Sequence, residues 1–145
     1  METMSECVIR QAATGDAAAI EKLNRDVMGY DYPLPQVRLE EILHKPGHVL
    51  LVAQIGDAVA GYAHAEEYCL TYAPPYLNLL ALAVHEQYQR QGIGKKLLQA
   101  IEQYAQDIGA TGMRILSGNS RMAAHALYRG SGYSETTKHR FLKDY

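Results

Sequence analysis

Residues 79–94 read LLALAVHEQYQRQGIG, so an apolar run leads directly into a segment that contains two glycines. The run belongs to the largely apolar stretch Tyr76–Val84, which is typical of a strand covered on both faces near the centre of a sheet. Apolar residues then recur at helical spacing from Ile93 onward. Glycine lets backbone N–H groups converge, and a helix N-terminus carries about half a positive charge. The turn therefore predicts a cradle for a phosphate group.

Two better-known phosphate motifs do not fit this turn, and an ordinary compact strand-to-helix turn is the alternative reading. A P-loop would need a hydroxyl residue where Lys96 stands. A dinucleotide-binding turn would need a third glycine where Leu97 stands. Polar side chains beside the glycines can add hydrogen-bond donors to the cradle: Gln89, Arg90, Gln91, Lys95 and Lys96.

Strand-like and helix-like segments alternate along the chain. Helices are expected from a cap at Thr14 or Asp16 to Gly29, over 37–43, over 92–109 and over 121–130. Strands are expected over 7–12, 48–55, 58–68, 76–84 and 113–116, and two more short strands after Tyr133. The Gly56-Asp57 connection predicts an antiparallel hairpin. This order predicts a single α/β (α+β) domain over residues 1–145, with a mixed, mostly antiparallel central sheet and helices on both faces.

Composition excludes several classes of function. The 145 residues contain 14 Lys and Arg against 16 Asp and Glu, a net charge of −2, which argues against nucleic-acid binding. The longest apolar run is far shorter than the roughly 20 residues of a membrane span, so we expect a soluble, cytoplasmic protein with no membrane partner. Cys7 and Cys69 show no disulfide pattern, and the histidines lack metal-ligand spacing. No metal site is expected.

Two motifs resemble the Gcn5-related N-acetyltransferase (GNAT) family. The family's acetyl-CoA motif Q/R-x-x-G-x-G/A lies between a central strand and a helix, and Gln89, Gly92 and Gly94 match it here. The family's later motif has an Asn-bearing loop, a helix that ends in Ala-x-x-Leu/Phe-Tyr, and then Gly-Phe/Tyr. Residues 117–119 (SGN), 124–128 (AHALY) and 132–133 (GY) fit that second pattern. The order of the elements agrees as well, so the resemblance covers nearly the whole chain.

The resemblance implies acetyl-CoA as cosubstrate, held between the strand that ends at Val84 and the strand that ends near Leu116. Its pyrophosphate would rest on backbone amides of the turn, and its pantetheine arm would pair with the edge of the first of these strands. Either Asn119 or Arg121 would contact the pantetheine, since the commonest family spacing puts the Asn at position 121. The implied cofactor-binding residues are Leu82, Ala83, Val84, Gln89, Arg90, Gln91, Gly92, Ile93, Gly94, Lys95, Asn119 and Tyr128.

The resemblance also implies direct attack of an amine on the thioester, without a covalent enzyme intermediate. Tyr128 would protonate the departing thiolate. Many relatives carry a basic carboxylate on the central strand, whereas this strand reads Asn78-Leu79-Leu80-Ala81-Leu82. The candidate bases are therefore Glu66, Glu67 and His64 on the preceding strand; alternation puts His64 and Glu66 on one face and Glu67 on the other.

The sequence leaves the acceptor open between a small-molecule amine and a protein amino group. Tyrosines gather in the two loops that should flank the acceptor groove, where they could stack on a cation or simply pack. The nearby acids, which include Asp31 and Glu40, would suit a cationic amine. A homodimer is expected, because members of this family often form dimers. The alternative function is a non-catalytic acyl-CoA-binding sensor module. The tyrosines in question are Tyr30, Tyr32, Tyr68, Tyr72 and Tyr76.

Overall fold

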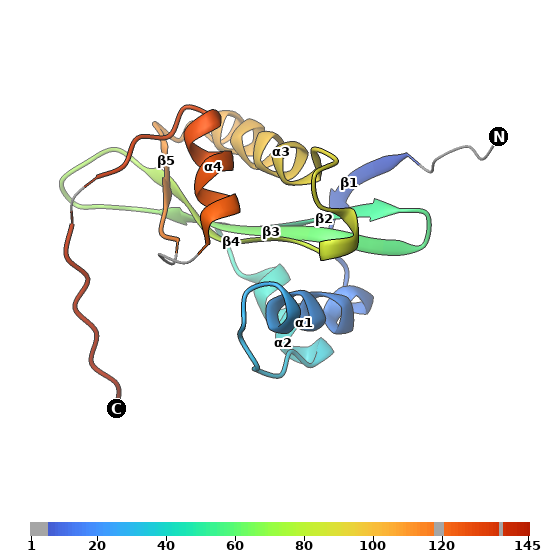
Figure 1. The fold of residues 1–145 in the computed structure, drawn as a ribbon. Coiled ribbons are helices and arrows are strands. Elements are labelled where there is room, and N and C mark those ends of the chain that lie inside the picture. The colour runs from blue at the N-terminus through green and yellow to red at the C-terminus, as the bar shows by residue number, and fades with distance from the viewer. Residues whose placement is uncertain (1–5, 118–120, 137) are drawn as a thin grey trace.

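A five-stranded sheet organises the computed structural model, which describes residues 6–117, 121–136 and 138–145. Two helices, α3 and α4, lie on one face of the sheet, and α1 and α2 lie on the other (Figure 1). The strands are β1 (Cys7–Gln11), β2 (His48–Ile55), β3 (Ala58–Tyr68), β4 (Tyr76–Val84) and β5 (Met113–Ile115). The α-helices are α1 (Ala17–Asp26), α2 (Gln36–His44), α3 (Ile93–Asp107) and α4 (Met122–Gly130), and short 3₁₀ turns cover Thr14–Asp16 and Glu86–Tyr88.

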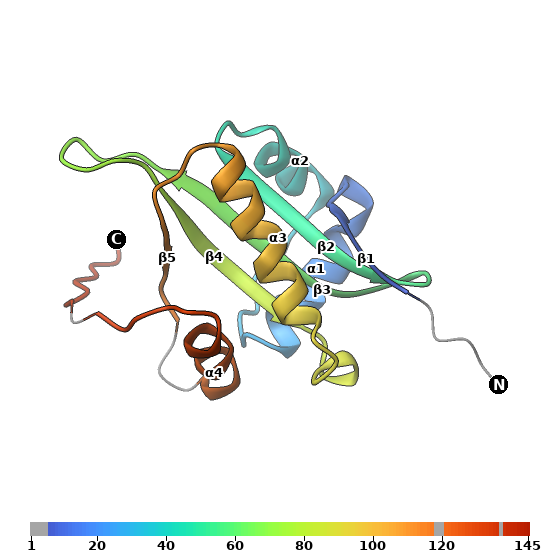
Figure 2. The same cartoon turned by 90° about the horizontal axis from the view of Figure 1, so that it is seen from above.

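The strand order β1-β2-β3-β4-β5 confirms the predicted mixed, mostly antiparallel sheet. The first four strands pair antiparallel, and β5 alone runs parallel to its neighbour β4. The Gly56-Asp57 hairpin is present between β2 and β3. The expectation that Tyr76–Val84 is the central strand is wrong. The middle of the sheet is β3, and β4 lies one place toward the β5 edge (Figure 2).

Each face of the sheet has its own apolar core. Under α3, the small residues Ala60, Ala63 and Ala65 of β3 pack with Leu97 and Ile101, which are fully buried. On the other face, Ile20 of α1 and Leu39 of α2 pack against Leu50, Val52 and Tyr62. Small side chains on one face of β3 therefore let α3 approach closely, while larger ones on the other face support the helix pair.

An extra residue in β4 separates this strand from β5. His64 lies opposite Ala81 and Ala65 lies opposite Leu79, so Leu80 has no counterpart on β3 and forms a bulge. Within the described residues, β5 pairs with β4 only as far as Leu79. A bulge bends its strand, and the outer edge of β4 from Leu80 to Val84 is left open beside the start of α4 (Figure 2).

Several boundaries differ from the sequence prediction. Helix α1 ends at Asp26 instead of reaching Gly29, and Val37 of α2 faces solvent instead of the core. The two strands expected after Tyr133 are wrong for residues 133–136 and 138–145, which form neither strand nor helix. The physical reason is that β5 has only three residues, so its free edge offers little backbone for a further strand. No helix among the described residues is long and apolar enough to cross a membrane.

Asp16 stabilises the link between β1 and α1, although not by the expected cap on α1. Its carboxylate accepts hydrogen bonds from both terminal nitrogens of Arg10, at 2.8 and 2.9 Å, and from the backbone N–H of Ala13 at 2.7 Å. The bonds from Arg10, with a smaller contribution from Ala13, hold the pKa of Asp16 below its usual value.

Replacement of Asp16 by Asn should lower the free energy of unfolding at pH 7, because the ion pair is lost. A carboxyl group whose pKa is lowered in the folded state stabilises the fold at pH values above its pKa in the unfolded state, about 3.9. The stabilisation is lost as pH falls through the folded-state pKa, so the difference between the two proteins should shrink toward pH 2. Urea unfolding at pH 7 and pH 2 measures this, with the exposed Asp26→Asn as a control that should change little.

Gly61 allows β3 and β4 to approach each other beneath α3. A Cβ at this position would lie 2.7 Å from the carbonyl oxygen of Ala83 and 3.3 Å from a methyl of Leu97. Gly61→Ala should therefore lower the free energy of unfolding by about 1–3 kcal/mol, the usual cost of overpacking. Gly15→Ala is the matched control, since nothing lies within 4 Å of its Cβ position. Equal stability of both variants in urea titrations would contradict the assignment.

Candidate active site at the open edge of strand β4

The turn between β4 and α3 has a backbone shape that leaves amide groups free. Arg90 has φ of 66° and Gly92 has φ of 77°, so two residues of the turn adopt the left-handed conformation. The first hydrogen bond of the helix runs from Lys96 N–H to the Gly92 carbonyl at 3.0 Å. The N–H groups of Ile93, Gly94 and Lys95 precede it and have no intrahelical acceptor. The predicted cradle is therefore built as a helix N-terminus with amides available to an anion.

One side chain of the turn bonds to β4, and others are exposed to solvent. The Gln89 side-chain amide donates to the Val84 carbonyl at 3.0 Å, so it fixes the turn onto the end of β4. Arg90, Gln91 and Lys95 are exposed and free to meet a ligand. The side chain of Ile93, the first residue of α3, is buried in the core, so only its backbone can contribute to the cradle.

Gly94 brings the first turn of α3 against two other elements. A Cβ here would lie 3.3 Å from a methyl of Leu127 in α4 and 3.7 Å from a methyl of Val84. The second glycine of the motif thus serves close packing between α3, β4 and α4, in addition to its exposed amide.

Arg121, which occupies the N-cap position of α4, binds the open edge of β4 through its side chain. The guanidinium Nη2 donates to the Leu82 carbonyl at 3.0 Å. In a strand, the N–H and C=O of one residue point to the same side, so the Leu82 N–H also faces the open edge. The Leu82 side chain lies in the core under α3, and that of Ala83 lies in the core on the opposite face. Arg121 thus contacts the predicted pantetheine position, while Asn119 lies outside the described residues.

Tyr128 projects from α4 into the core beneath α3. Its ring meets Tyr133 edge to face, with 6.2 Å between centroids. Burial raises the pKa of the Tyr128 phenol, and the positive charge of Arg121 offsets part of that rise. The phenol is therefore protonated at neutral pH and can act as a proton donor.

Tyr62 is a residue that the sequence reasoning did not single out. It lies opposite Ala83 on the α1–α2 face of β3, where its hydroxyl donates to the Asn24 side chain. Burial raises its pKa, and again Arg121 is the charge that opposes the rise. Tyr62 and Tyr128 lie on opposite faces of the sheet, and the charge of Arg121 lowers the pKa of both. This agrees with the position of the guanidinium at the edge of β4. The signal in the sequence was an aromatic residue flanked by the small residues Gly61 and Ala63 of β3.

A cavity of about 540 Å³ opens beside this edge. It lies where the end of α1, the turn after β4 and the start of α4 meet, so three separate parts of the sequence form it. Its lining residues are Arg25, Asp26, Val27, Met28, Gly29, Gln89, Arg121, Met122, Ala123 and Ala124.

The candidate bases separate as strand alternation requires. His64 and Glu66 lie on the α1–α2 face of β3, and His48 of β2 lies between them, a partner that the sequence reasoning missed. Glu67 faces the other way, with its side chain beside Gly47. Glu66 is opposite Asn78 of β4, so the strand without a carboxylate has one directly across from it.

The tyrosines of the two flanking loops do not form one wall. The Arg38 guanidinium lies 5.3 Å from the centre of the Tyr32 ring, and that of Arg114 lies 4.7 Å from the centre of Tyr68. Those two rings already meet cations of the chain itself. Tyr30 and Tyr72 are largely exposed and remain open to a ligand.

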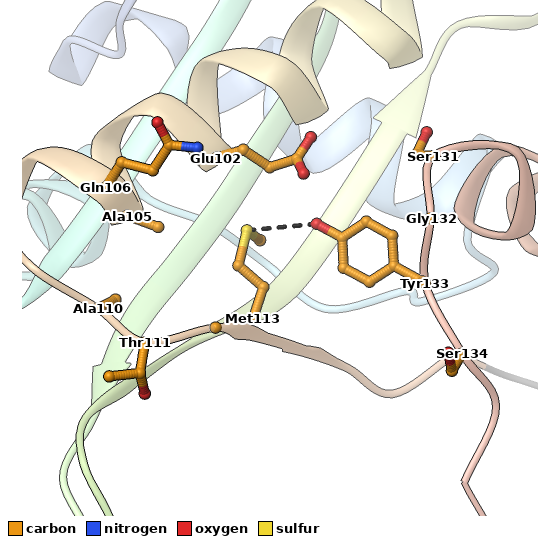
Figure 3. Close-up of a pocket in the computed structure, with 11 residues that line it drawn as sticks. Glu102, Ala105, Gln106, Ala110, Thr111, Met113, Ser131, Gly132, Tyr133 and Ser134 are labelled. Carbon is orange, nitrogen blue, oxygen red and sulfur yellow. Dashed lines mark hydrogen bonds between the residues drawn. The ribbon is translucent and has the colours of Figure 1, made fainter.

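A second cavity, of about 480 Å³, lies at the other end of α4 (Figure 3). Tyr133 points into it, with its hydroxyl 3.3 Å from the Met113 sulfur. Burial, together with the nearby Glu102, raises the pKa of Tyr133. The turn residues and Arg121 are not among the residues that line this cavity, so the two hollows are separate features.

Comparison with known proteins agrees with this geometry. The model of the acetyltransferase (GNAT) family matches residues 17–133. The chain is 28% identical to thialysine N-epsilon-acetyltransferase of Bos taurus, over 93% of this chain and 88% of the relative. It is 30% identical to aminoglycoside N(6')-acetyltransferase type 1 of Stenotrophomonas maltophilia, over 90% and 88% of the two chains.

Two further matches differ in extent. N-acetyltransferase family 8 member 2 of Rattus norvegicus is 38% identical over 59% of this chain, and the match spans only 38% of the rat protein. An aminoglycoside acetyltransferase from an uncultured soil metagenomic sample superposes with a TM-score of 0.83 at 22% identity, covering 96% of this chain and 97% of that chain. The chain therefore belongs to the acetyltransferase (GNAT) family and is an N-acetyltransferase.

Proposed function

We propose that this protein moves the acetyl group of acetyl-CoA to a primary amine of a small molecule, by direct attack of the amine on the thioester. The observation that carries the proposal is the convergence at the open edge of β4. The amides of the turn, the Leu82 N–H and Tyr128 belong to three elements that pack together. Leu82 and Tyr128 share one buried cluster, and Gly94 at the turn lies against Val84 of β4 and Leu127 of α4.

The residues present fit acetyl-CoA. The amides at the start of α3 suit a pyrophosphate, and exposed Arg90 and Lys95 add charge beside them. The edge Leu82–Val84 suits an extended amide-bearing arm, which would pair with it as a further strand does. Arg121 already occupies the Leu82 carbonyl, so it is expected either to contact the arm or to give up this bond when the arm binds.

Leu82 and Tyr128 would serve two different steps of the reaction. The Leu82 N–H faces the edge and would stabilise the oxyanion that forms when the amine attacks, a contribution on the order of 3 kcal/mol. Tyr128 would donate its proton to the departing thiolate, whose unperturbed pKa near 8.5 lies below that of a phenol. The charge of Arg121, which acts on Tyr128, would favour the tyrosinate that remains.

Small cationic amines are the proposed acceptors. The relatives named for thialysine and for aminoglycosides support this class. The partly exposed carboxylate of Glu66 supplies negative charge on the α1–α2 face of β3, which would attract such an amine.

A sensor that binds acyl-CoA without turnover is the competing function, favoured by one observation. Many relatives carry a basic carboxylate on this strand, whereas β4 has no Asp or Glu and supplies no such base. Acetyl-CoA binding without release of free thiol in the presence of amines would support the sensor.

Replacement of Tyr128 by Phe should lower kcat by about 10²-fold, because general acid catalysis is lost while the ring still fills its site. The Kd for acetyl-CoA should change less than twofold. Thiol release with thialysine and with an aminoglycoside measures turnover, and calorimetry measures binding. Tyr133→Phe is the matched control, since its hydroxyl lies at Met113 and Glu102 in the second cavity and away from the turn and Arg121. Full activity of Tyr128→Phe would refute the role.

Replacement of Gly92 by Ala should raise the Kd for acetyl-CoA about tenfold, because φ of 77° is strained for alanine and the amides of the turn would shift. Gly109→Ala is the matched control at the other end of α3, with φ of 76° and equally open space. Calorimetry with acetyl-CoA compares the two. A similar loss of affinity in both variants would show that general destabilisation, and not the cradle, is responsible.

A further inference from the structure

Three titratable side chains form a chain of contacts on the α1–α2 face of the sheet. The Nδ1 atom of His48 lies 2.9 Å from Nε2 of His64, and its Nε2 atom lies 3.2 Å from Oε2 of Glu66. The strand register places them, because His48 is opposite Glu66 and His64 is two residues before Glu66 on the same face of β3. His48 therefore joins the carboxylate to the second imidazole.

The carboxylate fixes the position of each proton in this chain. An ionised Glu66 only accepts hydrogen bonds, so Nε2 of His48 must carry a hydrogen. Nδ1 of the neutral His48 then has a lone pair, and Nε2 of His64 must donate to it. The remaining nitrogen, Nδ1 of His64, is left with a free lone pair. One carboxylate at the partly exposed end thus produces a base at the buried end.

The His64 end lies one strand in from the open edge of β4. His64 is opposite Ala81, the residue that follows the bulge at Leu80. Tyr62, two residues along the same face, is reached by the charge of Arg121. The side chains that face His64 from neighbouring strands are small or apolar, Leu50 on β2 and Ala81 on β4. Among the described residues, His48 is the titratable group in contact with His64.

His64 is neutral at physiological pH, so its Nδ1 lone pair is available. Burial lowers the pKa of His64 to about 4, and a positive charge on His48 would act in the same direction. An imidazole with a lowered pKa holds a proton only weakly, so His64 would have to pass the proton on to His48 and Glu66.

We propose that Glu66, His48 and His64 form a proton relay that removes the proton from the acceptor amine during acetyl transfer. This proposal rests on the proposed function. His64 is the catalytic residue, which takes the proton directly or through one water. His48 and Glu66 are positioning residues that act through it.

The acceptor ammonium loses two protons in the reaction. The first passes to Nδ1 of His64, while the Nε2 proton of His64 passes to His48 and the Nε2 proton of His48 passes to Glu66, which releases it to water. The amine nitrogen then forms a bond to the acetyl carbon, the carbon–sulfur bond breaks, and Tyr128 protonates the thiolate. The second proton leaves the nitrogen after the carbon–nitrogen bond has formed and returns through water to Tyr128, so one proton is released overall and no further reactant is needed.

The relay is tested first without any acceptor, by long-range ¹H–¹⁵N correlation spectra of the histidine rings at pH 7. We expect both His48 and His64 as the Nε2–H tautomer. In Glu66→Gln the amide can donate or accept, so His48 should show a mixture of tautomers. Glu67→Gln, on the other face of β3, should leave the tautomers unchanged. A His64 ring with hydrogen on Nδ1, or unchanged spectra in Glu66→Gln, would overturn the relay.

Kinetics with acetyl-CoA and thialysine provide the second test. His48→Gln and Glu66→Gln should lower kcat at least tenfold at pH 7, while KM for acetyl-CoA stays within twofold. The deficit should shrink toward pH 10, because solvent then deprotonates an amine of pKa near 10.4 in place of the relay. A deficit that is constant with pH, or a larger loss in Glu67→Gln than in Glu66→Gln, would overturn the relay.

The two proposals fail in different ways. If wild-type protein binds no acetyl-CoA, the acetyltransferase site is refuted while the tautomer measurement still reports on the histidines. If it binds and transfers normally but the histidine tautomers are not as stated, only the relay is refuted.

Discussion

One extra residue in β4 is the constraint on which the active-site architecture depends. A regular strand would continue its hydrogen bonds to β5 along its full length. The bulge at Leu80 coincides with the end of that pairing after Leu79, so among the described residues the backbone from Leu80 to Val84 has no strand partner on this side. An unpaired strand edge inside a protein is costly unless something bonds to it. Arg121 meets part of this need, and a bound pantetheine arm would meet the rest.

Packing around that edge follows from residues of small size. Gly61 lets β3 and β4 lie close beneath α3, and Gly94 brings the first turn of α3 against Val84 and Leu127. These contacts fix the direction in which the helix N-terminus points. The amides of the turn and the open edge are consequently parts of one rigid framework, because both are attached to β4. A ligand that spans them would meet a site that is formed before it binds, which lowers the cost of binding.

Electrostatics on the two faces of the sheet serve different tasks. Arg121 lies at the edge and opposes the burial-driven rise of the pKa in both Tyr62 and Tyr128. On the α1–α2 face, burial keeps His64 uncharged while Glu66 retains contact with solvent. The proposed proton donor, Tyr128, and the proposed proton acceptor, His64, therefore lie on opposite faces of the sheet. This separation suits a reaction in which one group gives a proton and another takes one.

The sequence by itself determined the order of the main elements, the turn at Gln89–Gly94 and the position of Tyr128, because these depend on local periodicity and on motifs of a few residues. It erred at the end of α1, at the central strand and after Tyr133, where neighbours in space decide whether a segment can pair or continue. Only the tertiary structure decided that Glu66 and not Glu67 joins the histidines, and that His48 links them. The reason is physical: strand register brings together side chains 16 residues apart, and no local pattern records which residues of two strands will face each other.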